Sequence, residues 1–137
     1  MIKQKVFTLP PFSQGMHLIT DIVLNEIESI LPESGLLHLF IKHTSAAITL
    51  NENADPSVRS DMENFINQLV PENVPYFEHT SEGSDDMPSH IKSSLIGTSL
   101  IIPITNKRLN LGTWQGIYLY EFRKYKKPRK IVATIIY

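Results

Sequence analysis

The sequence predicts an α+β protein, in which residues 1–137 form one compact domain made mainly of antiparallel β-sheet with two or three short helices. Strand-like segments outnumber helical ones, and they do not alternate strictly with helices as they do in parallel sheets. The length also fits one domain, because a chain of this size buries about two thirds of its unfolded surface. A hydrophobic core is therefore expected without disulfides, and the chain has no cysteine.

The first third of the sequence predicts a strand, a helix and a second strand, in that order. Residues 3–8 alternate polar and apolar side chains, as a half-buried strand does, and Pro10-Pro11 is expected to end it. Thr20 is a candidate cap for a helix that ends before Gly35. Residues 36–41 are almost continuously apolar, which is typical of a central strand.

The remaining elements follow in order. A strand is expected over 46–50, and then a helix capped by Asp55, with Pro56 at its first position. Its apolar residues, spaced by three and four, are Val58, Met62, Phe65, Ile66 and Leu69. A shorter helix should run from Pro88 to Gly97 and bury Ile91 and Leu95. Three strand candidates complete the chain, at 99–104, 116–122 and 130–137.

Charge is unevenly distributed along the chain. Residues 1–91 hold 13 acids and 4 bases, a net −9, whereas residues 92–137 hold 1 acid and 9 bases, a net +8. Six of the bases lie in the segment 123–130, which the pattern predicts to be a solvated hairpin turn. Few aromatic residues accompany these bases, and the first two thirds are acidic, so a nucleic-acid partner is disfavoured.

No segment approaches the ~20 apolar residues of a membrane span, and the N-terminus lacks the pattern of a signal peptide. We therefore expect a cytoplasmic protein with no membrane partner.

Three histidines, His43, His79 and His90, lie where strands or helices begin or end rather than on apolar faces. Imidazole is the commonest nitrogen ligand of transition metals, so they form a candidate metal site with an open position. Their spacing matches no recognised ligand signature, and scattered histidines more often serve as ordinary hydrogen-bonding residues.

Carboxylates and other polar groups accompany these histidines. Glu52, Asp85 and Asp86 are candidate general bases, metal ligands or partners that orient imidazoles, although Asp86 could instead cap the following helix. A helix start near His90 and Lys92 would favour a bound anion. Thr44, Ser45 and the turn 112–116 offer hydroxyl groups, an amide side chain and glycines that let a ligand approach the backbone closely. Such groups are suited to a phosphate pocket.

Four motifs carry a family resemblance: Lys-His-Thr-Ser-Ala-Ala from residue 42, Asn-Glu-Asn-Ala-Asp-Pro from 51, His-Thr-X-Glu-Gly-X-Asp-Asp-Met-Pro-X-His-Ile-Lys from 79, and Leu-Gly-Thr-Trp-Gln-Gly-Ile-Tyr from 111. Together, in this order, they resemble the YjbQ-like family, described as secondary thiamine-phosphate synthases. The resemblance covers essentially the whole chain. Its polar motif positions are His43, Thr44, Ser45, Asn51, Glu52, Asp61, His79, Asp86, His90, Lys92, Gln115 and Gly116.

The resemblance implies a YjbQ-like fold assembled as a homotrimer, with the motif residues gathered in a pocket near subunit contacts. It also implies a weak, secondary activity that couples a pyrimidine diphosphate to a thiazole phosphate and releases pyrophosphate. On this basis we expect a small phosphorylated ligand and a divalent metal, zinc, or magnesium with the diphosphate. The assigned residues are His43, His79 and His90 for the metal, Glu52, Asp86 and Lys92 for catalysis, and Thr44, Ser45, Asn51, Gln115 and Gly116 for substrate.

Two interpretations follow from this site. The protein is either a metal-assisted transferase, or a non-catalytic homotrimer that binds a metal or small molecule and whose measured catalysis is incidental. Orienting two anions and neutralising a leaving group requires no covalent nucleophile, which suits a chain without cysteine.

Overall fold

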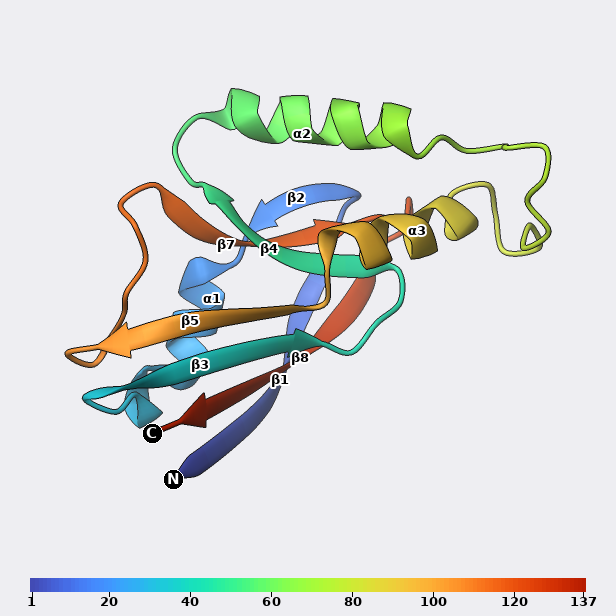
Figure 1. Cartoon of the computed structure of the whole chain (residues 1–137). Coiled ribbons are helices and arrows are strands. Elements are labelled where there is room, and N and C mark those ends of the chain that lie inside the picture. The colour runs from blue at the N-terminus through green and yellow to red at the C-terminus, as the bar shows by residue number, and fades with distance from the viewer.

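The computed structural model describes residues 1–137 and contains two antiparallel sheets and three α-helices, as the sequence predicts. The larger sheet has the order β1 (Ile2–Phe12), β8 (Lys127–Ile136), β3 (Ser34–Ile41), β5 (Ser99–Thr105) and β6 (Arg108–Leu109). The smaller one has the order β2 (Gly15–Leu18), β7 (Gln115–Glu121) and β4 (Ala46–Glu52). Figure 1 shows the smaller sheet above the larger.

The main core lies between the sheets. Inward residues of β3, Leu37, Leu39 and Ile41, are buried, whereas Leu36 and Phe40 on the opposite face of the strand are exposed. This alternation confirms that β3 is a central strand, paired with β5 on one side and β8 on the other. Helix α1 (Thr20–Ile27), followed by a short 3₁₀ turn (Glu28–Ile30), adds Val23 and Ile27 to the same core.

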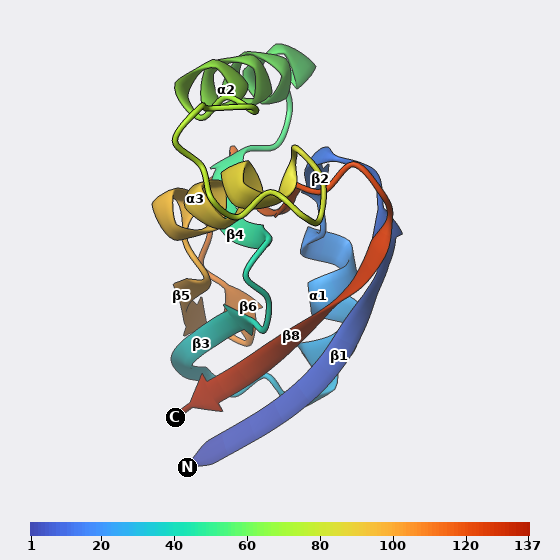
Figure 2. The same cartoon turned by 90° about the vertical axis from the view of Figure 1, so that its right-hand side faces the viewer.

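Helix α2 (Pro56–Leu69) stands on the far side of the smaller sheet (Figures 1 and 2). Asp55 caps it as predicted, accepting a 2.9 Å hydrogen bond from the Ser57 N–H. Only Ile66 of its apolar residues is buried, against a second small core of sheet residues, while Phe65 and Leu69 remain exposed.

Helix α3 (Asp86–Ile96) begins two residues earlier than predicted and packs along β4. The expected burial of Leu95 is wrong, because its side chain is exposed. The buried face is polar instead and carries Ser89, Lys92 and Ser93, of which Ser93 donates a 2.9 Å hydrogen bond to the Ala46 carbonyl. Hydrogen bonds to neighbouring backbone make burial of these hydroxyls tolerable.

Two further expectations are corrected. Pro10-Pro11 does not end β1, because β1 is an edge strand where proline costs no sheet hydrogen bond, and the register only shifts between Leu9 and Phe12. Thr20 does not cap α1: its hydroxyl accepts a 2.9 Å hydrogen bond from the Ile117 N–H.

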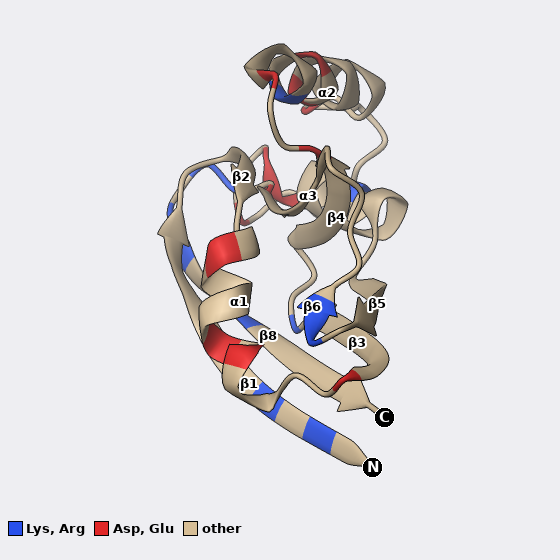
Figure 3. Ribbon diagram, turned by 90° about the vertical axis from the view of Figure 1, so that its left-hand side faces the viewer, with Lys and Arg blue, Asp and Glu red and all other residues tan.

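The basic segment 123–130 is not a solvated hairpin turn. It links β7 to β8, which belong to different sheets, and two of its six bases, Arg123 and Arg129, are buried in ion pairs. Away from this segment, Figure 3 shows acidic residues on α1 and α2 and basic residues on β1.

The two termini lie together at one edge of the larger sheet (Figure 1), where Ile2 pairs with Ile136. None of the helices is both long enough and apolar enough to cross a bilayer.

Candidate functional site

Three predicted site residues converge at the start of α3. His79 lies in the loop before the helix, Asp86 is its first residue, and His90 follows one turn later on the same face. One ligand atom from each of the three lies within 4.8 Å of the others. The Asp86 Oδ2 atom is 2.6 Å from His79 Nε2 and 3.4 Å from His90 Nε2.

A backbone contact fixes the orientation of the His90 ring. Its Nδ1 lies 3.0 Å from the Thr44 carbonyl oxygen. Because a carbonyl only accepts hydrogen bonds, Nδ1 carries the proton, and the neutral ring therefore keeps its lone pair on Nε2, which faces Asp86. Metal-binding histidines are commonly held in this way.

Asp86 is buried, and Arg123 donates to its Oδ1 atom, so that Oδ2 faces the histidines. Burial alone would raise the pKa of the Asp86 carboxyl group. The hydrogen bond from His79 and the charge of Arg123 outweigh this effect and hold the pKa of Asp86 below its usual range. Asp86 is therefore a carboxylate at neutral pH. It does not cap α3, because its oxygens are engaged by Arg123 and His79.

Arg123 also binds the preceding acid. Its Nε donates to Asp85 Oδ2 at 2.9 Å, and a second guanidinium nitrogen donates to the Glu82 carbonyl at 2.8 Å. The same Asp85 oxygen accepts a 2.9 Å hydrogen bond from the Lys124 N–H. Burial raises the pKa of Asp85, but these donors lower it overall. One arginine therefore joins the loop before α3 to the loop after β7.

The donor set fits a divalent transition metal. Tetrahedral zinc with ligands at about 2.0–2.1 Å places them about 3.3 Å apart, close to the 3.4 Å between Asp86 Oδ2 and His90 Nε2. The 2.6 Å between Asp86 Oδ2 and His79 Nε2 is a direct hydrogen bond, which a bound metal would replace. The His79 and His90 side chains are 47% and 33% exposed, so the site opens to solvent on the side where another ligand would bind. Two nitrogen donors favour zinc over magnesium, which prefers oxygen.

His43, predicted as a third metal ligand, does not belong to this cluster within the chain. Its Nε2 accepts a 2.8 Å hydrogen bond from the Lys130 N–H of β8. Burial, followed by the charges of Arg129 and Lys127, lowers the pKa of His43 below its ordinary value. The adjacent Ser45 hydroxyl accepts a 3.0 Å hydrogen bond from Arg129.

A second group of predicted residues lies at the opposite end of the smaller sheet. Asn51 pairs with Gly116 and Glu52 with Gln115 in the β4–β7 register. Residue 46 lies beside α3, and Glu52 follows it by six steps along the strand, a distance of about 20 Å. Within one chain these residues and the histidine cluster are therefore separate sites.

The contacts of this second group are mainly structural. Glu52 Oε2 accepts a hydrogen bond from the Asp55 N–H at 3.3 Å, and Gln115 Oε1 accepts one from the Gly112 N–H at 2.8 Å. A Cβ at Gly116 would lie 2.6 Å from Leu18 Cδ2 and 3.0 Å from Asn53 Cβ, so a larger residue there would displace these side chains. Asp61, another motif position, is exposed on α2.

Lys92 points away from the histidines. Its Nζ donates a 2.6 Å hydrogen bond to Asn67 Oδ1 of α2. Positions 90 and 92 are about 200° apart around a helix, which explains why neighbours in sequence face different sites. Conversely, sequence reasoning missed the role of Arg123, because nothing in its local pattern separates it from the exposed lysines that follow.

The comparisons with known proteins concern the whole chain. A family model described as UPF0047 protein YjbQ-like matches residues 5–137. UPF0047 protein YjbQ of Salmonella typhimurium is 54% identical over 133 residues, 96% of each chain, and the UPF0047 protein of Synechocystis is 39% identical over 132 residues, 96% of this chain and 90% of the relative.

Solved structures agree with this match. An uncharacterised YjbQ/UPF0047 family protein of Clostridium acetobutylicum superposes with a TM-score of 0.84 at 37% identity, covering 96% of this chain and 99% of its own. A YbjQ-like protein of unknown function from Sulfolobus solfataricus has a TM-score of 0.87 at 23% identity, with 98% and 96% coverage, and shows the fold alone. With this match across nearly its full length, the chain belongs to the YjbQ-like UPF0047 family.

Proposed function

We propose that the protein is a zinc-dependent transferase that acts on small phosphorylated substrates, with the metal held by His79, Asp86 and His90. The observation that carries this proposal is the convergence of these three ligand atoms within 4.8 Å. The fixed tautomer of His90 and the ionised state of Asp86 support it, because metal ligands must offer lone pairs.

The reaction we propose is the weak thiamine-phosphate synthesis implied by the family resemblance. Carbon–oxygen bond cleavage releases pyrophosphate from the pyrimidine diphosphate, and the thiazole nitrogen forms the new bond to the same carbon. A bound divalent metal would supply positive charge to the leaving diphosphate. His79, Asp86 and His90 would fix its place on the protein, and Arg123 would keep Asp86 oriented toward the histidines.

A homotrimer belongs to the same proposal. The outer face of the larger sheet exposes Val6, Leu36, Phe40 and Ile101, and apolar patches of this kind mark contact surfaces. A neighbouring subunit could bring its Glu52, Asn51 and Gln115 near the histidine cluster, from which they are distant within one chain.

The second candidate is a metal-binding protein without catalysis. Two observations favour it: Lys92 is directed toward Asn67, and the Arg123 guanidinium is engaged by Asp85 and Asp86. The cluster therefore has no free buried cation from its own subunit to receive a diphosphate.

Zinc titration of the purified, untagged protein by calorimetry tests both candidates. We expect His79→Ala and His90→Ala to weaken zinc binding at least about 100-fold, because each removes one ligand of three. His38→Ala, on the outer face of β3, is the matched control and should bind zinc as the wild type does.

Turnover separates the two candidates. Thiamine-phosphate formation that disappears with chelator, and in His90→Ala, would support the transferase. Zinc binding without any turnover would leave the non-catalytic protein, and failure of the wild type to bind zinc would refute both.

A further inference from the structure

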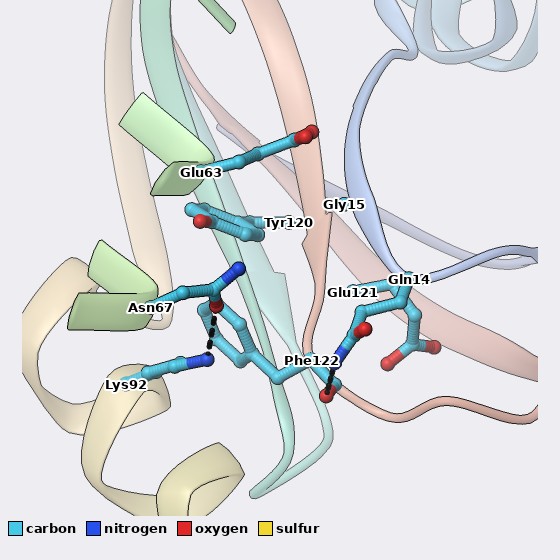
Figure 4. A pocket seen from close by; sticks show the side chains of 8 residues that line it. All are labelled: Gln14, Gly15, Glu63, Asn67, Lys92, Tyr120, Glu121 and Phe122. Carbon is cyan, nitrogen blue, oxygen red and sulfur yellow. Dashed lines mark hydrogen bonds between the residues drawn. The ribbon is translucent and has the colours of Figure 1, made fainter. Parts of the chain in front are cut away.

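A second polar cavity lies away from the histidine cluster, between α2, α3 and β7 (Figure 4). Its volume is about 60 Å³, enough for several water-sized groups, since one water needs about 10–15 Å³ by this measure. It adjoins a groove of about 270 Å³ that shares Gln14, Asn67 and Lys92. None of the three proposed zinc ligands lines either space.

Lys92 supplies the positive charge of this cavity. Its side chain is 5% exposed, yet its ammonium group makes one hydrogen bond, to Asn67, and no ion pair. An ammonium group carries three donors, so two remain for a ligand. Burial lowers the pKa of Lys92, which is consistent with an ammonium group that has lost water without gaining an anionic partner.

Tyr120 supplies an unused hydroxyl. The residue is 2% exposed and lines the cavity, but its hydroxyl has no hydrogen-bond partner. Burial, together with the charge of Glu63, raises its pKa to about 12, so the hydroxyl is neutral and can both donate and accept. Buried hydroxyls nearly always find a partner, and this one therefore indicates a bound group.

Glu63 supplies the negative charge. Its Oε1 accepts a 2.7 Å hydrogen bond from the Met16 N–H, but it makes no ion pair, and Oε2 has no partner within the chain. The backbone approaches closely because residue 15 is glycine: its φ is +124°, and a Cβ would lie 2.7 Å from Glu63 Oε1. Figure 4 shows Tyr120 and Asn67 between Glu63 and Lys92.

We propose that this cavity binds a small zwitterion, such as an amino acid, with its carboxylate on Lys92, its ammonium group on Glu63 and the Tyr120 hydroxyl between them. An unpaired cation and an unpaired anion that do not pair with each other are both neutralised by a ligand that carries both charges. A phosphate dianion fits less well, because Glu63 would repel it and only one lysine would compensate.

A buried carboxylate near the cavity, that of Glu121, does not change this balance. Glu121 accepts hydrogen bonds of 2.7 and 2.5 Å from Arg129, so its charge is already compensated. The ligand therefore meets one net positive and one net negative group.

Titration of the full chain with glycine, followed by amide chemical shifts in α2, α3 and β7, tests this proposal. A ligand of about five heavy atoms should bind in the millimolar range. Acetate and methylammonium, which each carry one of the two charges, should bind at least about tenfold more weakly.

Three variants should each weaken glycine binding about tenfold: Lys92→Met, Glu63→Gln and Tyr120→Phe. Tyr120→Phe removes a hydroxyl that has no partner within the chain, so it should fold normally and retain wild-type zinc affinity. Lys124→Met is the control, because Lys124 is an exposed residue of the adjoining groove that pairs with Glu72.

Three results would overturn the proposal: no shifts with glycine up to about 100 mM, equal binding of acetate and glycine, or unchanged glycine binding in Tyr120→Phe and Glu63→Gln. In the first case the cavity holds only water. Zinc affinity is measured separately, so failure here leaves the proposed metal centre untouched.

Discussion

Two buried arginines, Arg123 in the loop after β7 and Arg129 in β8, form ion pairs of different kinds. Arg129 and Glu121 are 1% and 0% exposed, and the two side chains share two hydrogen bonds, with Ser45 accepting a further one. Arg123 lies between Asp85 and Asp86, and Asp86 turns its second oxygen toward two partly exposed histidines. The charges of the first pair compensate each other within the protein, whereas in the second Asp86 Oδ2 faces away from the arginine and contacts the two histidines.

This difference indicates how one type of interaction serves two purposes. A buried pair in which the two charges compensate each other serves to hold the fold together. A pair that neutralises a carboxylate from one side, and leaves its other side open, orients that carboxylate for binding. Changes at the two arginines should therefore separate stability from metal affinity.

The largest effect is expected from Arg129→Met. It leaves the Glu121 carboxylate buried without its partner, which should lower the free energy of unfolding by about 3–5 kcal/mol. Urea unfolding at low temperature measures this loss. Replacing both residues with methionine should recover most of the loss, and a double variant as unstable as the single one would show that the pair does more than compensate charge.

Arg123→Met should cost less stability, about 2 kcal/mol, because Asp86 still contacts His79 and His90. Its zinc affinity should fall about 10–100-fold as Asp86 loses its orientation. Calorimetric zinc titration gives this value, with Lys126→Met in the same loop as the control. Equal zinc affinity in Arg123→Met and wild type would contradict the distinction between the two arginines.

The smallest effect concerns His43, beside the closed pair. Burial and the nearby cations lower its pKa, so on acidification the unfolded chain takes up this proton first. The stability contributed by neutral His43 is present above its unfolded pKa of about 6.5 and is lost as the pH falls through the folded value. His43→Gln keeps an acceptor for the Lys130 N–H and should lose less stability than wild type between about pH 7.5 and pH 5.5. Identical losses in urea unfolding would show that His43 does not titrate differently in the folded state.

Local patterns predicted most of the strands and the capped helix α2. The almost continuous apolar run of residues 36–41 predicts a central strand, and Asp55-Pro56 marks a helix start regardless of its surroundings. The contact between Asp86 and His90 could also be predicted from the sequence, because side chains four residues apart lie next to each other on a helix.

Other features depend on contacts between distant residues. The buried face of α3 was expected to be apolar, but Ser93 and Lys92 find partners on β4 and α2 that no local pattern reveals. Arg123 reaches Asp85 across 38 positions of sequence. Residues of one motif also face different sites, as His90 and Lys92 of the motif from residue 79 show.

The pairing of β1 with β8 joins the first strand of the chain to the last, with Ile2 opposite Ile136. This gives the fold a high contact order, which slows folding because the two strands must meet across the whole chain. During synthesis β1 must wait as a solitary strand until β8 has been made. Lys3, Lys5 and the two prolines of β1 are the kinds of residue that discourage such a strand from pairing with other molecules. Strand β1, which pairs last, therefore contains residues that discourage aggregation while the chain is still being synthesised.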